Sequence, residues 1–181
     1  MKQIIFGIIL LCSLAGFSQK KATVKNTPTF YSIHHCIDKM TDEEYYLATT
    51  KLIGANKTKT KGITISPIFT KVQDTIKVEQ ILIENFGVGK CNEKSTLILM
   101  FDDSTKLTLE ASNKFNCDGD NYFDVYYDLD YKDLSTKKIK TIRYTNGYTY
   151  DSFTFDLTVS QKTYFINVIN NYKVKEINCD K

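Results

Sequence analysis

Apolar and polar side chains alternate along most of this chain with a period of two residues, which is the pattern of half-buried β-strands. The alternation predicts eight strands, at about residues 45–53, 62–70, 75–86, the two arms of a hairpin at 95–113, 122–128, 138–144 and 148–159. Within 75–86 the apolar phase slips by one residue near Gln80, and such a slip predicts a β-bulge.

Residues 95–113 predict a β-hairpin that turns at 102–104. One register makes a whole face apolar by pairing Leu97 with Ala111, Leu99 with Leu109 and Phe101 with Leu107. Extended outward, this register places Cys91 opposite Cys117. It therefore predicts a disulfide bond across the open end of the hairpin.

The turn and helix signals complete the pattern. Asn146-Gly147 is typical of a two-residue type I′ hairpin turn. Apolar side chains then change to helical spacing, which predicts an amphipathic helix at about 161–172. Ser160 is the expected N-cap, with Val159 and Tyr164 as a hydrophobic staple. The fold class that we expect is mainly β (α+β), with about eight mostly antiparallel strands in a barrel or a two-sheet sandwich and one C-terminal amphipathic helix packed on it.

The first residues predict an exported protein. An apolar run, Ile4–Leu14, follows Lys2, and the small residues Gly16 and Ser18 suit cleavage after Ser18. This is a secretory signal peptide, too short to span a membrane, and no later apolar run is long enough. The residue before Cys12 is a leucine, which disfavours a lipoprotein anchor. We expect residues 1–18 as signal peptide, 19–35 as a loose segment and 36–181 as one β-rich domain, in the periplasm or outside the cell.

The cysteines suit that compartment. Four remain after cleavage, an even number that indicates two disulfides in an exported chain. With Cys91 and Cys117 paired, Cys36 and Cys179 pair by elimination. His34, His35 and Cys36 are the alternative, as zinc ligands, but neighbouring residues on a strand point to opposite faces and no second ligand pair has zinc spacing.

Charge and motifs exclude several function classes. The formal net charge is only +3 and Arg143 is the sole arginine, which argues against nucleic-acid binding. The chain has neither a Gly-x-Ser-x-Gly elbow nor a phosphate-binding glycine loop. An acidic stretch suggests a calcium-binding loop, and it consists of Asp118, Asp120, Asp124, Asp128, Asp130 and Asp133. However, Tyr122 and Phe123 occupy the positions where such a loop needs an oxygen ligand and a glycine. We therefore expect no catalytic residue, metal or cofactor.

Tyrosines are unusually frequent, with twelve in the chain. Those that stay on outer strand faces would form a recognition surface, because exposed tyrosine is common at interfaces. The candidates are Tyr126, Tyr144, Tyr148 and Tyr150. The sequence favours an exported, non-catalytic domain that binds an envelope or extracellular protein or glycan. The alternatives are a carrier of a small apolar ligand in a β-enclosed pocket gated by the C-terminal helix and, third, a hydrolase that uses paired carboxylates.

Four segments resemble a family of small, uncharacterised exported proteins of Bacteroidota. They are Asp38-Lys39-Met40-Thr41, Leu99–Leu107, Lys114–Gly119 and Ile139–Gly147. The Phe-Ser-Gln end of the leader is similar to that of exported proteins from the same group. The resemblance covers about residues 36–169 and implies export and a single domain. No activity, ligand or site residue is implied by it.

Overall fold

The computed structural model describes residues 31–37, 44–72, 75–89, 91–112, 115–117, 120–126 and 130–176. These residues contain eleven strands and two short helices, so the chain is mainly β as its alternation predicts. The elements are β1 (Tyr31–Ile37), β2 (Glu44–Ala48), β3 (Leu52–Ala55), β4 (Gly62–Val72), β5 (Thr75–Phe86), β6 (Thr96–Phe101), β7 (Lys106–Glu110), β8 (Asp120–Asp124), α1 (Asp130–Thr136), β9 (Ile139–Thr145), β10 (Ser152–Asp156), α2 (Tyr164–Asn170) and β11 (Tyr172–Glu176).

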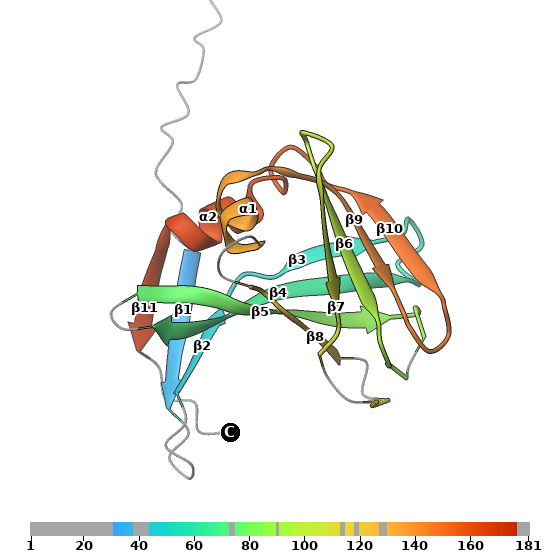
Figure 1. The fold of residues 1–181 in the computed structure, drawn as a ribbon, viewed down its shortest axis with the longest axis horizontal. Helices are drawn as coiled ribbons and strands as arrows, with labels where there is room; N and C mark the ends of the chain where they lie inside the picture. The colour runs from blue at the N-terminus through green and yellow to red at the C-terminus, as the bar shows by residue number, and fades with distance from the viewer. Residues whose placement is uncertain are drawn as a thin grey trace, which may run out of the picture.

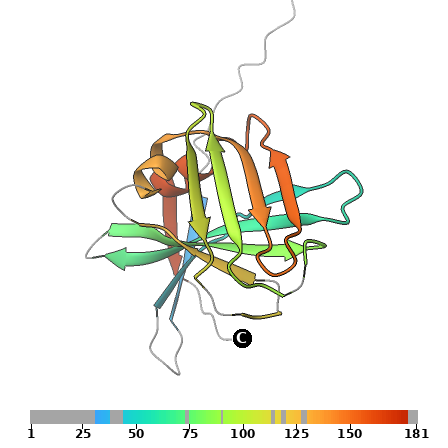
Figure 2. The same cartoon turned by 45° about the vertical axis from the view of Figure 1, so that its right-hand side comes forward.

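The strands form two mostly antiparallel sheets. The larger sheet has the order β11-β1-β2-β4-β5-β8, with β3 also paired to β4, and the smaller sheet has the order β10-β9-β6-β7. Only the β1–β11 pair is parallel among the described strands. The smaller sheet crosses β4 and β5 steeply, and both helices lie beside it over the larger sheet (Figures 1 and 2). This arrangement fits the two-sheet sandwich, and the described strands do not close into a barrel.

One apolar core lies between the sheets and under α2. Alternate residues of β3 and β7 are buried, as a period of two requires. The predicted apolar stripe of the C-terminal helix enters this core through Tyr164, Phe165, Val168 and Ile169. The helix is shorter than expected, because Tyr172 already belongs to β11.

The two sheets approach each other at both margins. On one side Ala111 at the end of β7 forms a bridge with Phe123 of β8. On the other side the Phe155 ring lies over Gly54 of β3, where a Cβ would fall 2.3 Å from a ring carbon. The close approach favours glycine there, because a side chain would have to displace the ring.

The β-bulge expected near Gln80 is present. Ile68 pairs with Gln80 and Phe69 pairs with Val78, so Glu79 is the additional residue of β5. Its carbonyl accepts the N–H of Val125 at 2.8 Å. The slip in the apolar pattern was therefore a reliable signal.

The strand expected at 45–53 is two strands, β2 and β3. β2 pairs with β4 at Ile68, and β3 pairs with β4 at Ile65. Between these contacts lies Pro67, which has no N–H to donate to a neighbouring strand. The chain leaves the sheet there, and the Thr50 carbonyl instead accepts the Tyr164 hydroxyl at 2.5 Å.

The register predicted for the 95–113 hairpin is wrong by two residues. Leu97 pairs with Leu109 and Leu99 with Leu107. The turn at 102–104 is tighter than the predicted register requires, because Ser104 adopts a left-handed φ of 67°. A shift of two residues keeps each side chain on its face, so the predicted apolar face is still buried.

Both chain ends differ from expectation. β1 begins at Tyr31, so residues 31–35 belong to the larger sheet and not to a loose segment. The helix N-cap is Thr163 instead of Ser160, and Val159 is 87% exposed, so no hydrophobic staple forms. Residues 159–163 form turns before the helix begins. Residues 1–30, which include the predicted signal peptide, lie outside the described part of the chain.

Candidate functional site

Three loops meet at one end of the sandwich, at the lower right of Figure 1. They are residues 91–95, 115–117 and 146–151. Asn92 and Asn116 exchange two backbone hydrogen bonds, with N–O distances of 2.7 and 3.2 Å. Gly147 lies against the neighbouring loop, where a Cβ would fall 1.9 Å from the Glu93 carbonyl oxygen. The loops therefore touch through backbone atoms and form one surface.

Three aromatic side chains project from these loops. Phe115, Tyr148 and Tyr150 are 54%, 56% and 81% exposed. The Phe115 and Tyr148 rings contact each other, with centroids 5.6 Å apart and planes at 65°. We call these three residues the aromatic loop face. Clustered exposed aromatic side chains are characteristic of recognition surfaces.

Tyr150 has an unfavourable backbone conformation. Its φ is 60°, in the left-handed region that glycine and asparagine adopt more readily than other residues. The conformation costs about 1 kcal/mol for a residue with a Cβ. Because the ring is largely exposed, burial of the ring does not offset that cost.

Beneath the aromatic loop face, buried polar side chains join the two sheets. The centre of this polar cluster is the hydroxyl of Tyr144 on β9, whose side chain is fully buried. The hydroxyl donates to Asn92 Oδ1 at 3.2 Å. It accepts from Asn121 Nδ2 of β8 at 3.0 Å and from Asn85 Nδ2 of β5 at 3.3 Å. The Ser95 hydroxyl lies 3.3 Å from it.

The ionisation of Tyr144 fits this role. Burial raises the pKa of the phenol above its ordinary value, and hydrogen bonds with Ser95 and Asn121 oppose part of the rise. The hydroxyl thus keeps its proton at neutral pH and stays a donor to Asn92. The cluster is a structural support that holds β5, β8 and β9 together under the loops.

Asn146 connects the polar cluster to the aromatic loop face. Its Nδ2 donates to the Cys91 carbonyl at 2.9 Å and to Asn92 Oδ1 at 2.8 Å. Its Oδ1 accepts the N–H groups of Tyr148 at 3.0 Å and Thr149 at 2.8 Å. One fully buried side chain therefore holds the cysteine-bearing loop and the tyrosine-bearing loop at once.

This arrangement overturns the two-residue type I′ turn predicted for Asn146-Gly147. Six residues, 146–151, separate β9 from β10. Asn146 acts through its side chain, which closes the turn by accepting two backbone N–H groups. Gly147 does not have a positive φ, and close approach to Glu93 explains the glycine there.

The four tyrosines predicted as a recognition surface do not lie together. Tyr148 and Tyr150 are exposed on the aromatic loop face, as expected of such a surface. Tyr144 was wrongly assigned to it, because its β9 position points into the core. Tyr126 is 72% exposed, but it follows the other end of β8, a strand about 13 Å long that begins at Asp120.

The structure has the predicted disulfide between Cys91 and Cys117. Beside it the chain follows the predicted register, since Asn92 pairs with Asn116. Two additional residues between Ala111 and Asn116 explain why the pairing was right although the hairpin register was wrong. Cys36 is also disulfide-bonded, whereas Cys179 lies outside the described residues, so their pairing stays a prediction.

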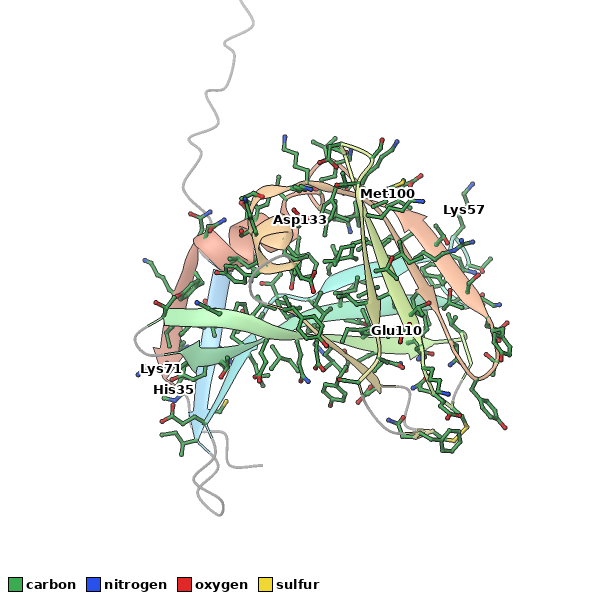
Figure 3. All side chains as sticks on the ribbon, in the orientation of Figure 1. His35, Lys57, Lys71, Met100, Glu110 and Asp133 are labelled. Atoms are coloured by element: carbon green, nitrogen blue, oxygen red, sulfur yellow. A yellow bond between two sulfur atoms is a disulfide. The ribbon has the colours of Figure 1, made fainter. Side chains whose placement is uncertain are left out.

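The histidines lie far from the aromatic loop face, at the left of Figure 3 where His35 is labelled. His34 and His35 are successive residues of β1 and point to opposite faces. The His35 ring stacks on Tyr46 at 4.4 Å, and its Nε2 lies 3.3 Å from Glu44 Oε2. No group of three or more His, Cys, Asp or Glu side chains in the described part of the chain is placed to hold a metal ion.

Acidic side chains gather in a hollow of about 550 Å³ beside β7. Glu110, Asp124 and Asp130 line it together with the exposed Tyr126. Asp124 Oδ1 already accepts Gln80 Nε2 at 2.7 Å, and Asp130 Oδ2 accepts the Tyr126 N–H at 3.2 Å.

The other acids of this stretch that the structure describes, Asp120 and Asp133, do not line this hollow. Asp133 forms an ion pair with Lys137 at 3.0 Å. Asp118 and Asp128 lie outside the described residues. The described contacts of these acids therefore give the paired-carboxylate hydrolase no specific support.

A second hollow, of about 280 Å³, lies near the start of α2, where the sequence suggested a gated ligand pocket. Its lining mixes Leu52 and Ile53 with Lys51 and Gln161, so it is not the apolar enclosure that a carrier of apolar ligands needs. Between the sheets, the described core side chains are buried against each other.

Sequence reasoning missed the most connected residues of the site. Asn92 and Asn116 each neighbour a predicted disulfide cysteine, and that adjacency was a usable signal. Asn85, Asn121 and Phe115 carry no local signal, because only the fold brings them together.

Comparison with known proteins found no similar protein. No protein-family model matches this chain, and no curated protein or solved structure matches it.

None of the helices in the described residues has the length and apolarity needed to cross a membrane.

Proposed function

We propose that this protein is an exported, non-catalytic binding domain that contacts a protein or a surface component of the cell envelope through the aromatic loop face. The observation that carries the proposal is Tyr150. Its ring is 81% exposed on a left-handed backbone that asparagine or glycine would adopt at lower energy. A side chain that the fold does not need at such a position fits a role in contacting another molecule.

The support beneath the face is consistent with binding. Asn146, the polar cluster around Tyr144 and the Cys91–Cys117 disulfide all restrict the loops that carry the rings. Aromatic side chains held in place lose little conformational entropy on binding, so more of the contact energy becomes affinity. The disulfide and the predicted signal peptide agree with a place outside the cytoplasm.

The test compares two variants of the mature protein. Immobilised wild-type protein, Tyr148→Ser/Tyr150→Ser and Tyr126→Ser are each incubated with a detergent-solubilised envelope fraction of the producing cells, and bound proteins and glycans are quantified. We expect a component that wild type and Tyr126→Ser retain and the double variant loses at least tenfold. Tyr126 is a matched control because it is a tyrosine of intermediate exposure, 72% against 56% for Tyr148 and 81% for Tyr150, and lies remote from the face. Equal retention by all three proteins would refute the proposal.

A further inference from the structure

We propose that the Cys91–Cys117 disulfide controls the order of the aromatic loop face, so that binding through this face depends on the redox state of the two cysteines. The relevance to binding rests on the proposed function, but the control of loop order does not. Two separate routes of contact connect the disulfide to the aromatic rings.

The first route runs through Asn146. Its Nδ2 donates to the carbonyl of Cys91 at 2.9 Å, while its Oδ1 holds the N–H groups of Tyr148 and Thr149. The position of Cys91 therefore fixes the side chain that closes the tyrosine loop. If Cys91 moves, Asn146 Nδ2 loses one of its two acceptors. The Asn146 side chain is then less fixed, and so is the loop whose N–H groups it binds.

The second route runs through Phe115. It lies two residues before Cys117, and its ring rests against Tyr148 at 5.6 Å. The described backbone bonds that tie residues 115–117 to a neighbouring segment are the pair between Asn92 and Asn116. Without the disulfide, the segment depends on these two bonds and on longer side-chain hydrogen bonds, such as Asn92 Nδ2 to Asn116 Oδ1 at 3.5 Å. Loss of the covalent bond therefore frees Phe115 to leave Tyr148.

The chemistry is ordinary thiol–disulfide exchange with a dithiol reductant, such as a reduced oxidoreductase of the envelope. A reductant thiolate attacks one sulfur, and its second thiol resolves the mixed disulfide. Two electrons pass to the Cys91–Cys117 bond, each cysteine ends as a protonated thiol, and the reductant becomes a disulfide. Cys117 is an exposed residue, which allows such an attack.

NMR spectroscopy of the full mature protein tests the proposal without a partner. Protein in its oxidised form is compared with protein reduced by dithiothreitol, and with Cys91→Ser/Cys117→Ser. In both disulfide-free forms we expect loss of the ring–ring NOE between Phe115 and Tyr148. Backbone order parameters of residues 147–150 should fall from about 0.85 to below about 0.6.

The β6–β9 ladder is the internal control. NOEs between Leu99 and Ile142, which pair across that ladder, should remain and show that the protein is still folded. If the serine variant does not fold, Cys36→Ser, which lacks the other disulfide bond seen in the described residues, supplies the measurement when it is compared before and after reduction. Unchanged order at 147–150 in a folded, reduced protein would overturn the proposal, and so would loss of the ladder NOEs together with the loop NOEs at every degree of reduction.

A further variant separates this inference from the proposed function. Tyr150→Asn leaves Asn146, Phe115 and the disulfide in place, so the loop should still loosen on reduction. If the loop responds to reduction but no envelope component depends on Tyr148 and Tyr150, the redox control stands and the proposed function falls. If binding depends on the tyrosines but the loop order does not respond, the opposite holds.

Discussion

The two ends of this sandwich are held by different forces. At the helical end, α1 and α2 bury Leu134, Phe165 and Val168 in the apolar core, and the described contacts of these residues are non-directional packing. At the loop end, a disulfide and a network of directed hydrogen bonds around Tyr144 and Asn146 hold the chain. The apolar end tolerates conservative changes of shape, whereas the polar end depends on individual atoms.

The difference bears on which end could carry the proposed binding surface. The exposed side chains of the helical end include ion pairs such as Lys162–Asp102 at 2.8 Å. The loop end instead exposes aromatic rings on a rigid support. Directed polar contacts can fix loop positions closely without covering the loops with other elements, so the loops stay accessible. Five predictions test this contrast.

The largest effect is expected at the helical end. Phe165→Ala removes a ring that is 1% exposed, and we expect a loss of about 3–5 kcal/mol in the free energy of unfolding, measured with urea. Val159→Ala, at a position 87% exposed, is the control and should change stability by less than about 0.5 kcal/mol. A small loss for Phe165→Ala would mean that α2 does not seal the core.

The next effect concerns the disulfide. Cys91→Ser/Cys117→Ser opens a loop spanned by 26 residues and should lower the free energy of unfolding by about 3 kcal/mol. The physical reason is the larger conformational entropy of the unfolded chain. Dithiothreitol should lower the stability of wild type by more than that of this variant, which keeps the disulfide of Cys36. An equal effect of the reductant on both would locate the stabilising disulfide elsewhere in the chain.

A single hydroxyl tests the polar cluster. Tyr144→Phe leaves Asn92, Asn121 and Asn85 without their shared partner in a buried site, and we expect a loss of about 2 kcal/mol by urea denaturation. Tyr126→Phe is the matched control, and its exposed hydroxyl should matter little. Equal stability of the two variants would mean that the cluster contributes no net stability at the loop end.

Tyr150→Asn should raise the stability of the protein, whereas the preceding substitutions lower it. Asparagine accepts the left-handed backbone more readily, so we expect the free energy of unfolding to rise by about 1 kcal/mol. The same substitution should weaken binding of the envelope component that the proposed function predicts. A stability gain together with a loss of binding would identify the strained tyrosine as retained for recognition. Lower stability in the variant would show that the ring supports the fold after all.

The smallest effect is expected from the Asp103 carboxylate at the helical end. The pKa of Asp103 is held below its ordinary value by hydrogen bonds that its carboxylate accepts from the hydroxyl and N–H of Thr105. The positive charge of Lys137 nearby lowers this pKa further. A carboxyl with a lowered folded-state pKa adds stability above the unfolded-state value of 3.8, and this stability is lost as the pH falls through the folded-state pKa. Asp103→Asn should therefore lose slightly less stability than wild type between pH 5 and pH 2. Identical acid profiles would contradict the ionic contribution.

How much of the structure could be predicted depended on how far apart in the sequence the interacting residues are. Alternation within β5 located both the strand and its bulge, because neighbouring residues set the strand face. The hairpin at β6 and β7 was located correctly but paired with the wrong register. The conformation of Ser104 decides that register, and the apolar pattern is compatible with both pairings.

For the candidate site, Tyr148, Tyr150 and the Cys91–Cys117 pair could be found from the sequence. Tyr144 was misassigned because the apolar residues of β9 do not follow one alternation. Ile139 and Ile142 are both buried although they are three positions apart, and the pairing of β9 with β6 shifts in register between them. The strand β11 was missed because its parallel pairing with β1 joins two ends of the chain that share no local pattern.

The sequence by itself determined the β-rich character, the apolar faces of the strands, the amphipathic stripe of α2 and the cysteine pair, since each depends on neighbouring residues or on one hairpin. The tertiary structure decided which tyrosine is buried and which is exposed. It also brought Asn85, Asn92, Asn121 and Asn146 around one hydroxyl from β5, β8 and the loops beside β6 and β9. Those contacts span from 23 to 59 positions of the chain, and hydrogen bonds at that separation form only when packing of the apolar core has placed the strands.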